Sequence, residues 1–188
     1  MIDSSSGGSP AVPLAAVAGV YTVPIRAFPD ERGCFMETFR QEWFPQVSWA
    51  QLQGNRSESK AGVLRGLHYH LQQVDYWIVP RGVIRAGLVD LRRSSPTYRS
   101  AVALEMGDAN NIGLFIPVGV AHGFLALTDC TVTYLVNRYY AGGSDEFGVM
   151  WNDPALHLDW QLDGEPILSQ RDRQNPRLQD IPAAQWPK

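Results

Sequence analysis

The chain has 188 residues and a mass of 20.9 kDa, the size of one domain whose core needs neither disulfides nor a structural metal. Hydrophobic residues make up 45% of the chain, charged residues make up 19%, and the formal net charge is -3. This composition is not typical of a disordered, nucleic-acid-binding or membrane protein. The two cysteines, Cys34 and Cys130, make no disulfide framework, and the N-terminal stretch lacks the pattern of a signal peptide. These features predict a cytoplasmic globular protein.

The first residues are rich in Ser, Gly, Pro and Ala, which predicts a flexible leader over residues 1–16 and a single domain over residues 17–188. Within that domain, short β-branched and aromatic runs alternate with Gly, Pro, Asp and Asn. The runs are GVYTVPI, GCFMETF, VDYWIVPRG, GVIRAGLVDL, RSAVALEM, GLFIPVG, GFLALTD and TVTYLVNRYY. Many short strands in one domain predict an all-β sandwich or barrel.

Helical signals are weak along the whole chain. Two stretches, RQEWFPQVSW and the segment around DPALHLDW, are short and broken by proline. After about residue 152 the chain becomes polar and proline-rich, yet Trp160, Ile167 and Leu168 need an apolar surface to rest on. We therefore expect an ordered C-terminal tail packed over the β core.

Two of the four histidines stand one residue apart in GLHYHLQQVDYWIVPRG. In a strand, residues two apart point to the same face, so His68 and His70 are expected to act on one ligand. With Asp75 and with His122 of PVGVAH, their spacing resembles the paired motifs of the cupin superfamily. That resemblance implies a barrel in which the four side chains converge. They can bind one divalent transition metal, or they can line a pocket that holds none.

A second resemblance covers about residues 18 to 172. The motifs DERGCFMETF, NRSESKAGVLRGLHYH, VDLRRSSPTY, IPVGVAHGFLAL, TYLVNRYY, VMWNDPAL and EPILSQRD occur in the order found in dTDP-4-dehydrorhamnose 3,5-epimerases. This resemblance implies a metal-free cupin-type jelly-roll (double-stranded β-helix) barrel without a cofactor, in a homodimer with exchanged N-terminal strands. It also implies a nucleoside-diphosphate 4-keto-6-deoxy sugar as substrate, inverted at carbons beside the ketone in deoxysugar biosynthesis.

Epimerisation beside a ketone needs a base, a partner for the enolate oxygen and an acid on the opposite face. By resemblance, His68 is the base and Asp172 orients and charges it. Tyr134 matches the proton donor, and Tyr140 matches a second tyrosine of the sugar pocket. Each of these residues alone has an ordinary structural explanation, whereas their joint occurrence favours a catalytic site.

The resemblance also implies a set of substrate-binding residues. Arg65 and Arg171 match the cations that hold the diphosphate, for which the planar guanidinium fork is suited. The other positions are Arg32, Phe35 and Glu37, some of which reach the ligand across the dimer, Gln53, Asn55 and Ser57 along the approach, and His70 and His122. For the outer positions an ordinary polar surface is the competing interpretation.

One segment departs from the family pattern. Family members carry a lysine, thought to help stabilise the enolate, seven residues before the glycine equivalent to Gly82, and here that position is Asp75. An anion beside a developing oxyanion should weaken transition-state stabilisation. Together with His70, where the family commonly has Gln, the change moves toward the metal-binding pattern.

Three interpretations follow from these patterns. The first is a metal-free sugar-nucleotide epimerase. The second is a metal-dependent cupin enzyme that uses His68, His70, Asp75 and His122, in which His68 could not also be the free base. The third is a non-catalytic sugar-nucleotide-binding protein. We predict the epimerase, because the retained residues span the whole chain while the departures lie in one short segment.

Overall fold

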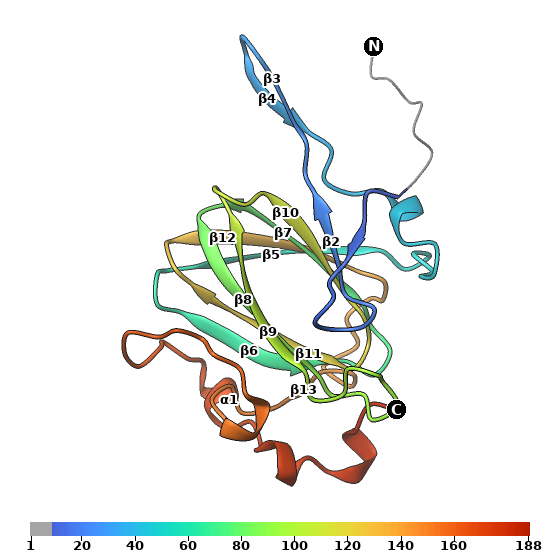
Figure 1. The fold of residues 1–188 in the computed structure, drawn as a ribbon, viewed down its shortest axis with the longest axis vertical. Coiled ribbons are helices and arrows are strands. Elements are labelled where there is room, and N and C mark those ends of the chain that lie inside the picture. Colours follow the sequence, from blue (N-terminus) through green and yellow to red (C-terminus); the bar gives the residue numbers. More distant parts are fainter. Residues whose placement is uncertain (1–8) are drawn as a thin grey trace.

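The computed structural model describes residues 9–188, and two antiparallel β-sheets face each other across its centre (Figure 1). The six-stranded sheet has the order β1 (Val12–Pro13), β2 (Tyr21–Pro24), β10 (Ile112–Ile116), β7 (Asp75–Arg81), β12 (Cys130–Val136) and β5 (Gln53–Ser59). The five-stranded sheet has the order β13 (Phe147–Gly148), β6 (Leu64–Tyr69), β11 (Val120–Ala126), β8 (Val83–Asp90) and β9 (Ala101–Gly107). Within residues 9–188 the two sheets do not close into one ladder, and the cupin-type jelly roll predicted from the sequence is confirmed.

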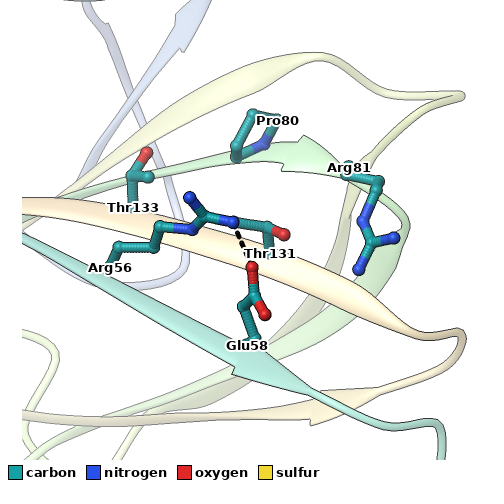
Figure 2. A pocket seen from close by; sticks show the side chains of 6 residues that line it. All are labelled: Arg56, Glu58, Pro80, Arg81, Thr131 and Thr133. Atoms are coloured by element: carbon teal, nitrogen blue, oxygen red, sulfur yellow. Dashed lines mark hydrogen bonds and ion pairs between the residues drawn. The ribbon is translucent and has the colours of Figure 1, made fainter.

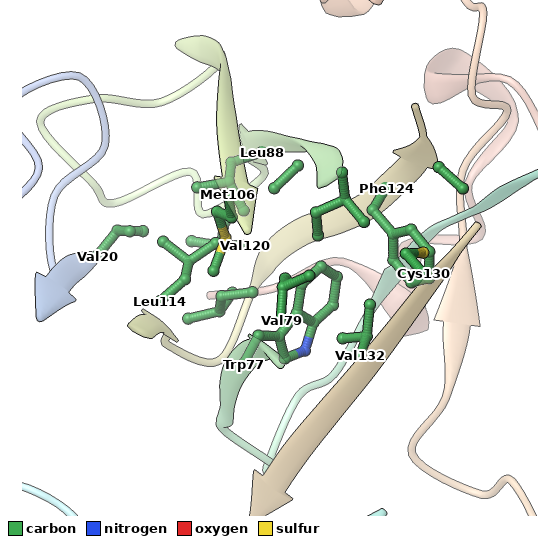
Figure 3. Packing of buried hydrophobic residues seen from close by; sticks show 14 of the residues in the cluster. Val20, Trp77, Val79, Leu88, Met106, Leu114, Val120, Phe124, Cys130 and Val132 are labelled. Carbon is green, nitrogen blue, oxygen red and sulfur yellow. The ribbon is translucent and has the colours of Figure 1, made fainter. Parts of the chain in front are cut away.

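Apolar side chains from both sheets meet between them. Trp77, Leu114 and Val132 of the six-stranded sheet pack with Leu88 and Phe124 of the five-stranded sheet (Figure 3). The residues that alternate with them point to the opposite faces of the sheets, where Tyr76 and Phe115 pack in one further buried cluster and Val89 and Leu125 in another. Each fully buried aliphatic side chain contributes about 1.5–3 kcal/mol relative to an exposed one. This core holds the two walls of the barrel at a fixed separation.

A two-stranded hairpin stands apart from both sheets. It consists of β3 (Ala27–Asp30) and β4 (Gly33–Met36), and it projects away from the barrel (Figure 1). Every residue of β4 is exposed, and Phe35 and Met36 place apolar side chains in contact with solvent. The single chain therefore leaves this hairpin largely uncovered.

The start of the fold differs from the predicted boundary. Residues 1–8 of the expected leader lie outside the described residues, but residues 9–16 belong to the fold. β1 pairs with β2, and Leu14 and Ala16 pack against the core. The ordered domain begins before residue 17 because these apolar residues have a surface to cover.

The C-terminal tail covers the five-stranded sheet, as the sequence predicts (Figure 1). Trp160 and Leu168 pack in a second apolar cluster that includes Leu67 and Tyr69 of β6. Ile167 is 57% exposed instead. Its carbonyl accepts from the backbone N–H of Leu64 at 3.0 Å. The tail is thus tied to β6 by backbone hydrogen bonds as well as by apolar contacts.

In residues 9–188, helical structure is limited to single turns. The two weakly helical stretches form only 3-10 turns, η1 (Gln41–Trp43) and η2 (Pro154–Leu156). The tail adds α1 (Gln170–Arg173), η3 (Leu178–Asp180) and η4 (Ala183–Gln185). Among the described residues, we find no helix that combines the length and the hydrophobicity of a membrane span.

Candidate active site

A cavity of about 1100 Å³ opens between the two sheets. β5 shows how the strands divide their side chains between this cavity and the outer surface. Gln53, Asn55 and Ser57 line the cavity. The alternating residues Arg56 and Glu58 form an ion pair beside a separate hollow (Figure 2). The predicted approach residues therefore lie on the inner face, because successive strand residues point to opposite faces.

His68 of β6 and Asp172 of α1 form a hydrogen-bonded pair at the cavity wall. Nε2 of His68 lies 2.6 Å from Oδ1 of Asp172, whose side chain is only 4% exposed. Burial alone would raise the pKa of Asp172, but hydrogen bonds from His68 and from Ser169 hold it below its ordinary value. An ionised carboxylate only accepts, so Nε2 carries the proton and Nδ1 of the neutral ring keeps a lone pair. This is the arrangement of a general base.

Two glycines set the position of His68. A Cβ on Gly66 would lie 2.7 Å from Cα of Gly123, and Gly66 has a φ of 122°, where other residues are strained. The pairing of β6 with β11 shifts register between His122 and Phe124, beside these glycines. The close approach that the glycines permit makes His68 and His122 direct neighbours across the two strands.

Tyr134 of β12 lines the cavity from the opposing sheet. Burial, together with the negative charges of Asp75 and Glu146, raises the pKa of Tyr134. The phenol is therefore protonated at neutral pH and can donate a proton. The imidazole of His68 and the protonated phenol of Tyr134 thus stand on opposite walls of one cavity.

His70, Asp75 and His122 form a second, buried group in the same cavity. One potential ligand atom from each lies within 4.8 Å of the others. His70 follows the last residue of β6 directly, and its Nδ1 lies 2.5 Å from the carbonyl oxygen of Asp145. The structure thus brings together three of the four residues of the predicted metal set, whereas His68 is paired with Asp172.

His122 is the most enclosed residue of this group. Its Nδ1 lies 2.9 Å from the carbonyl oxygen of Val120, and its ring meets Trp77 edge to face with centroids 5.3 Å apart. Burial lowers the pKa of His122 to about 4, although the charge of Asp75 acts in the opposite direction. His122 is therefore a neutral imidazole at physiological pH.

Three arginines supply the positive charge of the cavity. Arg65 is oriented by a bond of 2.9 Å from its Nε to Oγ of Ser59, and Arg171 pairs with Glu146 at 2.6 Å. Arg138 also lines the cavity and was not predicted from the sequence. Among the described residues that line the cavity there is no lysine. The two predicted diphosphate-binding arginines therefore lie in one cavity with the pair of His68 and Asp172, called the dyad below.

Tyr140 lies at the rim, with 70% of its surface exposed. Its backbone N–H donates to Oε1 of Gln53 at 2.9 Å, and Nε2 of Gln53 donates to Oδ1 of Asn55 at 2.8 Å. These bonds tie the 137–146 loop to β5. The structure thus connects three of the predicted substrate-binding residues through one chain of hydrogen bonds.

Three other predicted residues lie away from the cavity of their own chain. Arg32 and Phe35 belong to the projecting hairpin, Glu37 follows it directly, and none of the three lines the cavity. Arg32 pairs with Asp30 at 2.6 Å, and Phe35 is 59% exposed. A single chain therefore does not bring this part of the predicted binding set to the dyad.

Asp145 is the main site residue that the sequence did not indicate. Its carboxylate accepts the backbone N–H groups of Leu71, Gln72 and Gln73 at 2.8, 3.0 and 3.1 Å, and its carbonyl oxygen contacts His70. In the sequence it stands in a Gly-Gly-Ser-Asp-Glu stretch that is typical of a solvated turn. No local pattern indicates a contact between segments more than 70 residues apart.

Several known proteins that are similar to this chain are dTDP-4-dehydrorhamnose 3,5-epimerases. The family model for dTDP-4-dehydrorhamnose 3,5-epimerase matches residues 15–180. The dTDP-4-dehydrorhamnose 3,5-epimerase of Methanothermobacter thermautotrophicus is 38% identical over 171 residues, which cover 87% of this chain and 92% of that protein. These matches favour the epimerase interpretation over the metal-dependent and the non-catalytic ones.

Solved structures agree with the sequence comparisons. The dTDP-6-deoxy-D-glucose-3,5-epimerase of Legionella pneumophila, in complex with dTDP-4-keto-L-rhamnose, has a TM-score of 0.87 and 31% identity, covering 95% of this chain and 97% of that one. A 3'-monoepimerase of Streptomyces bikiniensis, in complex with dTDP-quinovose, has a TM-score of 0.86 and 33% identity, covering 94% and 92%. The chain belongs to the dTDP-4-dehydrorhamnose 3,5-epimerase family.

Proposed function

We propose that the protein inverts one or both carbons beside the ketone of a dTDP-4-keto-6-deoxyhexose, in deoxysugar biosynthesis. The observation that carries this proposal is the pair of His68 and Asp172, which faces Tyr134 across the cavity. The cavity volume of about 1100 Å³ is slightly above the usual range for small-molecule sites, and it suits an extended nucleotide sugar.

The residues support a two-step proton transfer. Nδ1 of His68 takes the proton from the carbon beside the ketone, and the electrons of that C–H bond move to the ketone oxygen, giving an enolate. Asp172 stabilises the imidazolium that results. The hydroxyl of Tyr134 then donates a proton to the opposite face of the carbon, and the ketone re-forms with the carbon inverted. A proton leaves and a proton returns, so the chemistry requires no redox cofactor.

Arg65 and Arg171 are proposed to hold the diphosphate. Both line the cavity, and Arg65 is already oriented by Ser59. Arginine presents two parallel N–H donors to phosphate oxygens. The related Legionella pneumophila structure contains a dTDP-linked keto sugar, which supports the same class of substrate here.

The hairpin supports a homodimer with exchanged N-terminal strands. It carries Arg32 and exposed Phe35 away from the cavity of its own chain, and Phe35 and Met36 leave apolar surface uncovered. We propose that these residues, with Glu37, reach the cavity of a second copy. Each cavity would then combine a dyad from one chain with binding residues from its partner.

We also propose that the enzyme works in the cytoplasm. Both cysteines are free thiols, with Cys34 exposed and Cys130 buried. Exposed free thiols persist in a reducing compartment. Recovery of the protein in the cytosolic fraction of its own cells tests this proposal.

The function is tested by incubating the protein with dTDP-4-keto-6-deoxyglucose and following the sugar by NMR. We expect the coupling constants of the ring protons to report inversion beside the ketone. The matched control is dTDP-glucose, which has no ketone to acidify the neighbouring C–H bonds and should not react. Folded protein that inverts neither carbon of the keto sugar would contradict the proposal.

A further inference from the structure

We propose that His70, Asp75 and His122 together bind one divalent first-row transition metal ion. Nε2 of His70 lies 3.9 Å from Oδ1 of Asp75, and Nε2 of His122 lies 3.8 Å from Oδ2 of the same carboxylate. All three residues are buried, and they line the cavity. Two imidazoles and a carboxylate thus converge on one small volume.

The outer hydrogen bonds of the two rings determine which nitrogen faces that volume. Nδ1 of His70 contacts the carbonyl oxygen of Asp145, and Nδ1 of His122 contacts that of Val120. A carbonyl oxygen only accepts, so Nδ1 carries the proton in both rings. In the neutral rings, Nε2 therefore presents a lone pair toward Asp75. Metal-binding histidines are held in this way, with the second ring nitrogen donating to a backbone carbonyl or a carboxylate.

Asp75 is held in place and keeps free acceptor capacity. Trp77 Nε1–H donates to its Oδ2 at 3.1 Å, and Gln73 Nε2 donates to its Oδ1 at 2.9 Å. A carboxylate has about four acceptor positions, so capacity remains on both oxygens. The side-chain amide of Gln73 also lies 3.2 Å from Nε2 of His70. The amide nitrogen of Gln73 therefore lies between Oδ1 of Asp75 and Nε2 of His70, and a bound cation would displace it.

The donor set selects the class of ion. Imidazole nitrogens suit Zn²⁺, Co²⁺, Ni²⁺ and Fe²⁺, whereas Ca²⁺ and Mg²⁺ prefer oxygen ligands alone. Three protein ligands leave coordination positions open, as in catalytic metal sites.

This site differs from the metal site that the sequence suggests, because it does not use His68. The pair of His68 and Asp172 stays intact, so a free base and a bound ion can exist in one cavity. One consequence, which rests on the proposed function, is that the ion supplies positive charge to a cavity without a lining lysine among the described residues.

The test uses the full chain, purified without an affinity tag and stripped with a chelator. Titration with Co²⁺ is followed by visible absorption, which reports coordination by protein ligands, and titration with Zn²⁺ is followed by calorimetry. We expect one ion per chain for both metals. Because substrate is absent, this result does not depend on epimerase activity.

Four variants assign the site. D75N and H70Q should each weaken Co²⁺ binding more than about 100-fold, beyond the loss usual for an outer hydrogen-bond partner. H157Q, at the exposed fourth histidine, is the matched control and should bind as the wild type does, and so should H68N. Wild-type protein without a Co²⁺ spectrum, or binding that folded D75N and H70Q retain, would overturn the proposal. H70Q decides the test if D75N does not fold.

Discussion

The cavity and the β3–β4 hairpin both carry residues predicted to contact the substrate. The cavity residues hydrogen-bond to other predicted site residues of the same chain. His68 is fixed by Asp172, and Gln53 connects Tyr140 to Asn55. On the hairpin, Phe35 is largely exposed and Arg32 pairs with its neighbour Asp30. The proposed chemistry therefore needs residues of one barrel alone, whereas the proposed role of the hairpin needs a second copy.

Replacement of Tyr134, the proposed proton donor, gives the largest expected effect among the following predictions. In Y134F the base remains, so the carbon can still lose its proton, but nothing returns one to the opposite face. We expect inversion to fall by about 10²–10⁴-fold. Hydrogen exchange at the same carbon should fall much less. NMR in D₂O measures both rates, and equal losses of the two would contradict separate roles for the two walls.

The next largest effect is expected in D172N. An amide in place of the carboxylate removes the charge that stabilises the imidazolium, so we expect kcat to fall about 10²-fold with little change in KM. The pH profile of kcat should move, because His68 becomes a weaker base. An unchanged profile would mean that Asp172 has only a structural role.

D172N also gives a prediction for acid stability. The pKa of Asp172 is lowered in the folded protein, so its stabilising contribution is present above the unfolded pKa of about 3.9 and is lost as the pH falls through the folded value. The wild type should therefore lose stability more steeply than D172N below about pH 4. Thermal unfolding as a function of pH measures this difference.

The hairpin should give a smaller effect of a different kind. In F35A we expect KM to rise by about 10-fold, a loss of about 1.4 kcal/mol of binding, with kcat nearly retained, because the dyad is untouched. Y98A is the matched control, since Tyr98 is an exposed aromatic outside the hairpin and the cavity. If Y98A raises KM as much as F35A does, the hairpin has no special role.

The outer face of β5 should give the smallest effect. Arg56 and Glu58 pair on the surface away from the cavity (Figure 2). R56A should change the free energy of unfolding by less than about 1 kcal/mol, as is usual for exposed ion pairs, and should leave kcat/KM unchanged. N55A, one residue away but facing the cavity, should raise KM. Similar kinetics for both variants would contradict the assignment of the two faces.

The sequence predicted the short strands from their β-branched and aromatic runs, and the resemblance to the cupin superfamily predicted the jelly roll. It also predicted the residues of the dyad, because their motifs resemble those of the family. It did not predict the role of Asp145, which depends on contacts between distant segments. The leader boundary was placed too late, because Leu14 has a core contact that composition does not reveal. Composition and local spacing describe one strand at a time, whereas these contacts arise only when the sheets assemble.

The central claim is that His68, charged by Asp172, removes the proton beside the ketone. Solvent deuterium incorporation at the two flanking carbons of dTDP-4-keto-6-deoxyglucose tests it most directly, in wild-type protein and in H68N. We predict incorporation by the wild type at each carbon that it inverts, and a loss of about 10²–10⁴-fold in folded H68N. No incorporation by the wild type, or equal incorporation by H68N, would contradict the claim.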